Sequence, residues 1–118
     1  MTANDFRRLT LSFPETSESA HMGHPDFRVK NKVFATLAWP DETVAMVKLT
    51  PEQQEEFVHD SPKIFVPVKG GWGRKGATHV RLKAATKKAL MPAVEAAWRN
   101  TAPRKMIERY DARDSSDS

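Results

Sequence analysis

Five short segments with strand-forming side chains, separated by turns, constrain the fold of this 118-residue chain more than any other feature. The five segments are residues 27–29, 32–39, 44–49, 64–68 and 78–82. They are rich in β-branched and aromatic residues, which favour the pleated, half-buried surface of a sheet. Lys30 and Asn31 separate the first two segments, and asparagine tolerates the positive φ of a two-residue hairpin turn. We therefore expect a mostly antiparallel sheet of about five strands.

Alternation along these segments predicts which side chains share a face of the sheet. In residues 78–82, Val80 alternates with His79 and Arg81, so one face is apolar and the other is basic. In the second segment, the alternate positions expected to share one face are Val33, Ala35, Leu37 and Trp39.

Helix signals separate the predicted strands. The clearest is Thr50-Pro51-Glu52-Gln53, where threonine caps the helix, proline fits its first position and glutamine completes a capping box. The predicted helices span residues 3–13, about 51–59 and about 86–100, with a short last helix from about residue 103. Pro92 either bends the third helix or lies near its start, because an interior proline removes a backbone hydrogen bond.

These elements predict an α+β fold in the order α-βββ-α-ββ-α. We expect two layers, with helices packed on one face of the mostly antiparallel sheet. One domain should cover residues 1–110, because single cores commonly serve ~100–200 residues. Residues 111–118 are expected to form a disordered polar tail. Residues 15–26 and the glycine-rich residues 70–76 are expected to be loops.

Composition and motif content exclude several classes of protein. The chain has no cysteine, so it has no disulfides, thiolate zinc sites or cysteine nucleophiles. No apolar run approaches the ~18 residues of a membrane span, and the N-terminus lacks the apolar core of a signal peptide. We therefore expect a cytoplasmic protein without a membrane partner. No P-loop, nucleophile elbow or zinc-protease motif is present, and His21 and His24 lack further ligands, so we expect no enzyme, cofactor or metal.

Positive charge is concentrated in the second half of the chain. Residues 63–105 carry eleven basic residues and one acidic residue, whereas residues 1–62 carry six basic and ten acidic residues. Such a segment can form a positive face that attracts polyanions. Alternatively, the basic residues pair with the acidic first half of the chain, or they form an ordinary solvated surface.

The sharpest candidate site is the glycine-rich segment around Trp72. Glycine lets a backbone approach a phosphate closely, Arg74 can hold a phosphate with two donors, and an indole can stack on a base. Lys87 and Lys88 follow a predicted helix start, where a bound anion would offset the cost of placing two cations. The candidate nucleic-acid-binding residues are Lys69, Trp72, Arg74, Lys75, Arg81, Lys87 and Lys88. The alternatives are an indole folded onto the core and lysines that are merely exposed.

Five passages of the chain resemble the MmcQ/YjbR family of small bacterial proteins. They are Gly23-His24-Pro25-Asp26-Phe27-Arg28-Val29, Lys32-Val33-Phe34-Ala35, Val47-Lys48-Leu49, Gly71-Trp72 and Ala96-Ala97-Trp98-Arg99. The resemblance covers about Phe6 to Tyr110 and implies a fold similar to type III secretion chaperones, together with the family's frequent label of DNA binding. This chain departs from the family pattern at Gly73–Ala77, inserted before the last strand, and at Met22, where an aromatic residue is common.

The expected function is therefore binding of DNA with weak sequence preference. The basic face would be built from the glycine-rich hairpin tip and the start of the third helix, in a monomer or weak dimer. The alternative is a protein–protein interaction module of the secretion-chaperone-like fold. A small-molecule site would instead need a cavity lined by convergent polar groups.

Overall fold

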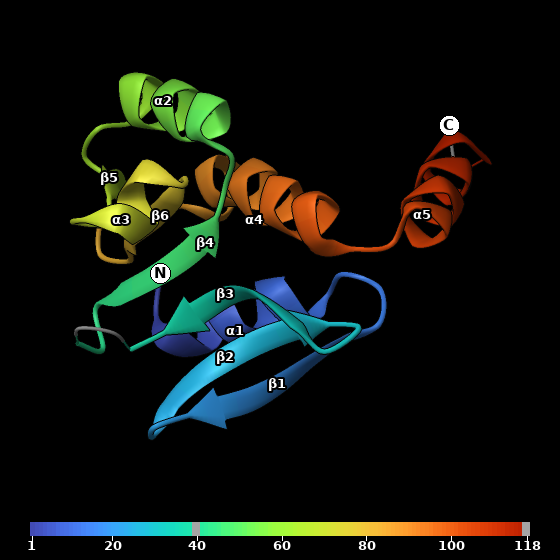
Figure 1. Cartoon of the computed structure of the whole chain (residues 1–118), viewed down its shortest axis with the longest axis horizontal. Coiled ribbons are helices and arrows are strands. Elements are labelled where there is room, and N and C mark those ends of the chain that lie inside the picture. Colours follow the sequence, from blue (N-terminus) through green and yellow to red (C-terminus); the bar gives the residue numbers. More distant parts are fainter. Residues whose placement is uncertain (39–40, 117–118) are drawn as a thin grey trace.

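The computed structural model describes residues 1–38 and 41–116, in which six strands form one antiparallel sheet (Figure 1). The strands are β1 (Thr16–His21), β2 (His24–Val29), β3 (Lys32–Leu37), β4 (Val44–Lys48), β5 (Phe65–Pro67) and β6 (Ala77–Arg81). The helices are α1 (Ala3–Leu11), α2 (Pro51–Asp60), α3 (Gly71–Arg74), α4 (Lys87–Thr101) and α5 (Arg104–Ser116). The order across the sheet is β1-β2-β3-β4-β6-β5, and each neighbouring pair is antiparallel. The predicted α+β class is confirmed, with one strand more than expected.

The additional strand is β1, which lies in a segment predicted to be a loop. Every residue after Thr16 in this strand is exposed, so no apolar alternation marks it in the sequence. Backbone pairing with β2 holds β1 in place as far as the pair His21 and His24. Between them, Met22 and Gly23 both take positive φ and close a tight turn.

Capping residues begin the helices where the sequence predicts them. The Thr50 hydroxyl accepts a hydrogen bond from the Gln53 N–H at 3.2 Å, and the Gln53 side chain accepts one from the Thr50 N–H at 2.9 Å. Thr2 and Asp5 form the same reciprocal pair at α1, where hydrogen bonds from Thr2 lower the pKa of Asp5. Helix α4 continues through Pro92, which lies in the helix interior rather than at its start.

Helices α1, α2 and α4 pack on one face of the sheet, as expected for a two-layer fold. Phe6 of α1 meets Phe27 of β2 edge-on, with ring centroids 5.9 Å apart. Phe57 of α2 contacts Phe65 of β5, with ring centroids 5.3 Å apart. Trp98 of α4 is fully buried in the same core. The other face of the sheet is therefore built from side chains that alternate with these core residues.

A bulge in β3 changes the alternation predicted for that strand. The pairing of β2 with β3 skips Phe34 between one residue pair and the next. Phe34 and its neighbour Ala35 are consequently both fully buried, and Val33 lies on the opposite face of the sheet. The prediction that Val33 shares a face with Ala35 and Leu37 is wrong for this reason. Trp39, the fourth residue of that predicted set, lies outside the described residues.

The glycine-rich segment forms the one-turn helix α3 instead of the predicted loop. A Cβ on Gly73 would lie 1.6 Å from the Val68 carbonyl oxygen, and a Cβ on Gly76 would lie 2.0 Å from that of Leu49. These glycines thus let α3 sit directly against the protein's own backbone. The Gln54 side chain of α2 donates a further hydrogen bond to the Gly73 carbonyl at 3.0 Å.

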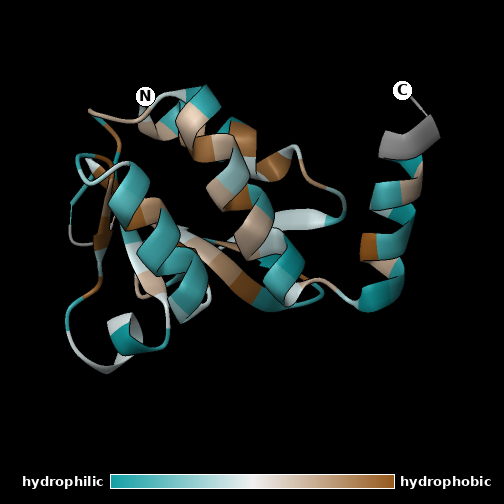
Figure 2. Cartoon of the chain, turned by 90° about the horizontal axis from the view of Figure 1, so that it is seen from above, coloured by the Kyte–Doolittle hydropathy of each residue, from teal (hydrophilic) through white to brown (hydrophobic). Residues whose placement is uncertain are grey.

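Helix α5 continues through Ser116, past the position where the sequence predicts a disordered tail. Tyr110 attaches this helix to the core. The centroid of its ring lies 5.0 Å from that of the Trp98 ring, and its hydroxyl donates a hydrogen bond to the Glu95 carboxylate at 2.8 Å. Met106 is also buried, although α5 is otherwise mostly hydrophilic in Figure 2. Within the described ranges, no helix combines the length and the apolar character that crossing a membrane requires.

Replacing Gly73 with alanine is expected to destabilise the fold by about 2 kcal/mol, because the new Cβ would clash with the Val68 backbone. Gly71→Ala is the matched control on the same helix, since its Cβ meets nothing closer than an Arg74 side-chain atom at 3.8 Å. Urea denaturation followed by circular dichroism compares the two free energies of unfolding. Equal values would contradict the close approach of α3 to the sheet.

Candidate functional site on the open face of the sheet

Helices α1, α2 and α4 leave the opposite face of the sheet uncovered (Figure 1). This face is hollowed into a groove of about 540 Å³, and α3 lies at its border. Strand alternation places the polar and half-buried neighbours of the core residues on this face. We call this feature the open groove. Its lining residues are His21, His24, Pro25, Asp26, Arg28, Val33, Thr36, Met46, Lys48, Val68, Trp72, Ala77 and His79.

One end of the open groove holds a fixed ion pair. Asp26 is only 3% exposed, and both of its carboxylate oxygens accept hydrogen bonds from Arg28, at 2.9 and 3.0 Å. Hydrogen bonding to Asp26 raises the pKa of Arg28. Because the two charges cancel, this pair contributes shape and hydrogen-bonding groups rather than net charge.

The opposite side of the open groove is bordered by an exposed indole. Trp72 of α3 is 65% exposed, and the Lys48 ammonium lies over its ring, 5.6 Å from the centroid. A cation–π contact of this kind stabilises by roughly 0.5–1 kcal/mol at an exposed site. The ion pairs among the described residues do not include Lys48, so its charge is not cancelled by a carboxylate.

His79 lies on the floor of the open groove, directly across from Met46 in the pairing of β4 with β6. It is half-buried, and burial lowers its pKa below the ordinary value of 6.5. His79 is therefore neutral at neutral pH, and a neutral imidazole has one hydrogen-bond donor and one acceptor. The described part of the chain contains no group of three or more His, Cys, Asp or Glu side chains placed to hold a metal ion.

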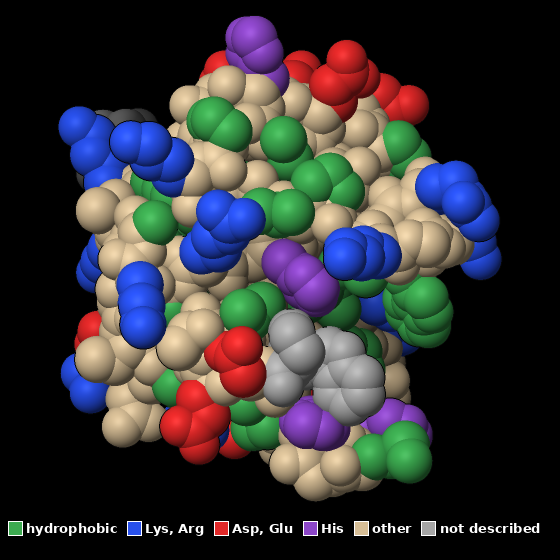
Figure 3. All heavy atoms as spheres, turned by 90° about the vertical axis from the view of Figure 1, so that its left-hand side faces the viewer, with side chains coloured by type: hydrophobic (Ala, Val, Ile, Leu, Met, Phe, Trp, Pro, Cys, Tyr) green, Lys and Arg blue, Asp and Glu red, His purple; other side chains and the backbone are tan. Residues whose placement is uncertain are grey.

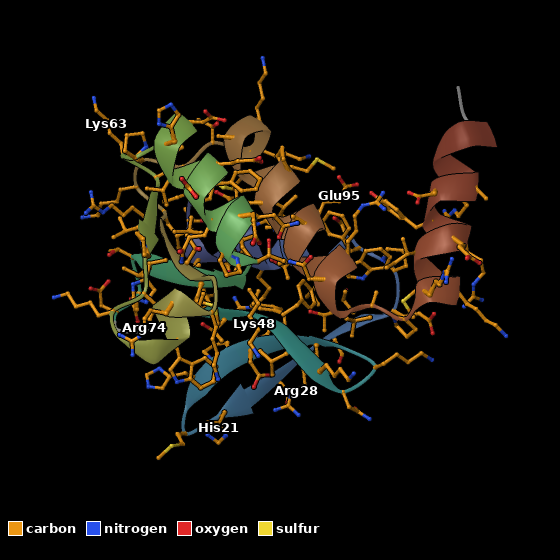
Figure 4. All side chains as sticks on the ribbon, turned by 45° about the horizontal axis from the view of Figure 1, so that its top comes forward. His21, Arg28, Lys48, Lys63, Arg74 and Glu95 are labelled. Atoms are coloured by element: carbon orange, nitrogen blue, oxygen red, sulfur yellow. The ribbon has the colours of Figure 1, made fainter. Side chains whose placement is uncertain are left out.

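The structure brings four of the seven predicted nucleic-acid-binding residues together. Trp72 and Arg74 belong to α3, and the exposed Lys69 and Lys75 flank that helix. Figure 4 shows Arg74 on α3, with Lys48 of β4 lying between Arg74 and Arg28 of β2 in this view.

The other three predicted residues lie elsewhere. Arg81 follows His79 by two positions on β6, so it shares the uncovered face but lies beyond the open groove. Lys87 lines a separate hollow with Asp5 and Arg8 of α1, on the face that the helices cover, and the exposed Lys88 is the next residue on α4. The single basic face expected from the hairpin tip and the third helix is therefore split between two sides of the molecule.

None of the six predicted cations takes part in an ion pair among the described residues. The ion pairs there use other basic residues, chiefly Arg7, Arg28, Arg99 and Arg104. The six predicted cations are therefore not neutralised by carboxylates of the acidic first half, as one alternative proposed. Figure 3 shows Lys and Arg side chains spread across the side that carries β5 and α3, separated by uncharged surface.

Sequence reasoning missed most of the open groove. Asp26 and Arg28 stand two residues apart in β2, and this spacing places both on one face of a strand. Lys48 was noted only within a passage that resembles the family, and His79 only as a residue of an alternating strand. Neither was predicted to belong to a binding site. Their convergence depends on the order of the strands in the sheet, which no local pattern encodes.

Comparison with known proteins identifies the fold and the family. A model of the YjbR family matches residues 11–100, and this chain belongs to that family. It is similar to the crystal structure of Deinococcus radiodurans protein DR2400, described as carrying domain DUF419, with a TM-score of 0.65 and 19% identity. That similarity covers 82% of this chain and 75% of the other chain. No protein of curated function matches, and the family match ends before α5.

His79 should make stability depend on pH. Because burial lowers its pKa in the folded chain, the unfolded chain binds this proton at a higher pH, and the free energy of unfolding falls as the pH drops below about 6.5. His79→Gln removes this contribution, so the variant should lose less stability than the wild type between about pH 7.5 and pH 5.5. His59→Gln, at the exposed end of α2, is the control. Urea denaturation at both pH values measures the difference, and an unchanged pH dependence in His79→Gln argues against its desolvation.

Proposed function

We propose that this protein binds single-stranded DNA across the open face of the sheet, with weak sequence preference and without catalysis. The observation that carries the proposal is the exposed Trp72 indole beside the open groove. Lys48 lies over the indole, and an indole that is 65% exposed offers ring surface on which a base can stack. Stacking of bases on aromatic side chains is sequence-tolerant, because every base has a π-face.

Cations surround the indole at positions suited to phosphates. Lys69, Arg74 and Lys75 are exposed on and beside α3, and Lys48 borders the same indole. The one carboxylate in the lining of the open groove is Asp26, which Arg28 neutralises. An anionic strand therefore meets no uncompensated negative charge in this lining, and its phosphates can pair with lysine and arginine.

A single strand fits this surface better than a duplex. An uncovered sheet with an exposed aromatic residue is suited to unstacked bases, which a duplex does not offer. The hairpin tip expected at the glycine-rich segment is replaced by the short helix α3, held close to the sheet by Gly73 and Gly76. Lys87 lines a separate hollow with residues of α1, away from the open groove and Trp72.

A second candidate is binding of an extended protein segment. Strand β1 is the edge of the sheet, and five of its six residues are exposed. An edge strand of this kind can pair with a strand from a partner. Its one charged residue, Glu18, is engaged by Arg7 at 2.6 Å, so it gives little protection against such pairing.

DNA binding should depend on α3 and not on the start of α4. With four phosphate contacts to a single strand, the slope of log affinity against log salt should be about −3, and Arg74→Ala with Lys75→Ala should reduce it by about 1.4. Trp72→Ala should weaken binding about tenfold or more through lost stacking. Lys87→Ala with Lys88→Ala is the matched control, because it removes the same charge from the opposite side.

Fluorescence anisotropy with a labelled oligothymidylate, titrated with salt from about 50 mM, gives these slopes. Equal effects of the two double variants, or no binding at the lowest salt, would reject the proposal. Retained binding to an extended peptide in the absence of DNA binding would favour the second candidate.

A further inference from the structure

We infer that the open groove holds one unstacked nucleobase of the bound strand, while Lys48 contacts its phosphate. This inference rests on the proposed function and names what part of the strand enters the groove. The inference is based on four residues that lie side by side on the same face of the sheet, one on each of four adjacent strands. The row runs from Asp26 to Thr36, then Met46, then His79.

The register of the sheet makes this row continuous. Asp26 pairs with Thr36, Thr36 pairs with Met46, and Met46 pairs with His79. All four line the open groove. Neighbouring strands lie about 4.8 Å apart, so Thr36 and His79 are separated by roughly 10 Å with Met46 between them. That distance matches the span of a planar heterocycle lying on the methionine.

The floor of the open groove suits a flat ring. Met46 lies between Thr36 and His79, and Val33 and Ala77 add apolar surface to the lining. A thioether makes favourable contacts with aromatic rings. The volume of about 540 Å³ falls within the range of roughly 300–1,000 Å³ typical of small-molecule sites.

The ends of the row suit the hydrogen-bonding edge of a base. The Thr36 hydroxyl both donates and accepts, and the neutral His79 imidazole has one donor and one acceptor. The Asp26 carboxylate beyond Thr36 accepts hydrogen bonds while Arg28 holds it. Donors and acceptors at both ends match the mixed edge of a nucleobase.

The positive charge of Lys48 favours a nucleotide over an apolar side chain as the occupant of the open groove. Lys48 follows Met46 by two residues on β4 and faces the same groove. Its ammonium has no ion-pair partner among the described residues, so an anion attached to the ring would supply one. A purely apolar guest would leave Lys48, Thr36 and His79 without polar partners in a site it had dehydrated.

The test compares an eight-nucleotide oligothymidylate with an abasic oligomer that carries the same number of phosphates. Wild-type protein should bind the oligothymidylate at least about tenfold more tightly. Thr36→Phe fills the open groove and should abolish most of this preference for the oligothymidylate over the abasic oligomer. Val44→Phe is the matched control, because Val44 lies on the same face of β4 but outside the groove lining, and it should keep the preference.

If Thr36→Phe keeps the wild-type preference, the base does not enter the open groove, although the strand still binds at Trp72. If the wild type binds neither oligomer, the proposed function itself fails. Thymidine monophosphate alone should bind at least a hundredfold more weakly than the oligothymidylate, since it lacks the neighbouring phosphates. Equal affinity would overturn the assignment to a nucleotide within a strand.

A second measurement uses the wild-type protein and does not depend on the folding of any variant. An oligothymidylate with one 5-iododeoxyuridine is bound, irradiated and mapped by mass spectrometry. Cross-links at Met46, His79 or Trp72 are expected. Cross-links confined to α1 or to the start of α4 would overturn the inference.

Discussion

Burial of one face of the sheet under α1 and α4 is the interaction on which the rest of the structure depends. Phe6 and Trp98 bring these helices onto the sheet, where Phe27 is fully buried. Because successive side chains of a strand point to opposite faces, burying Phe27 presents Asp26 and Arg28 on the other side. The core thus positions the groove residues through the backbone of the strands they share.

The position of Trp72 follows from close backbone packing rather than from side-chain contacts. Gly73 and Gly76 let α3 approach the carbonyl groups of the sheet region, and Gln54 ties α2 to the same segment. A large aromatic residue is thereby held at the edge of the sheet with most of its ring exposed. The glycines that the sequence suggested as phosphate contacts are used, at these two positions, to place the indole.

Local signals predicted the fold well where a residue acts through its immediate neighbours. Capping by Thr50, the strands of the central sheet and the family resemblance all follow from short stretches of sequence. The edge strand β1 could not be predicted, because backbone pairing with β2 places it and its side chains after Thr16 are exposed, which leaves no apolar alternation in the sequence. The bulge at Phe34 was not predicted either, because it arises from the pairing of β2 with β3 and not from the sequence of β3 alone.

The candidate site also has a part that local sequence predicts and a part that it does not. Trp72 and Arg74 lie within one short segment, so the sequence could place them together. The groove itself depends on β4 lying between β3 and β6, an order that joins segments far apart in the chain. For the same reason, the total positive charge of residues 63–105 misled the prediction of a single basic face. Helix α4 turns Lys87 toward α1, on the opposite side of the molecule from Trp72.

The central claim is that ligands of this protein bind the open face of the sheet and not its helical face. A nuclear magnetic resonance titration of labelled protein with a short oligothymidylate tests it most directly. The account predicts the largest shift changes at the Trp72 indole and at the amides of β3, β4 and β6, with α1 and the start of α4 unchanged. Changes confined to α1 and the first turn of α4 would contradict it.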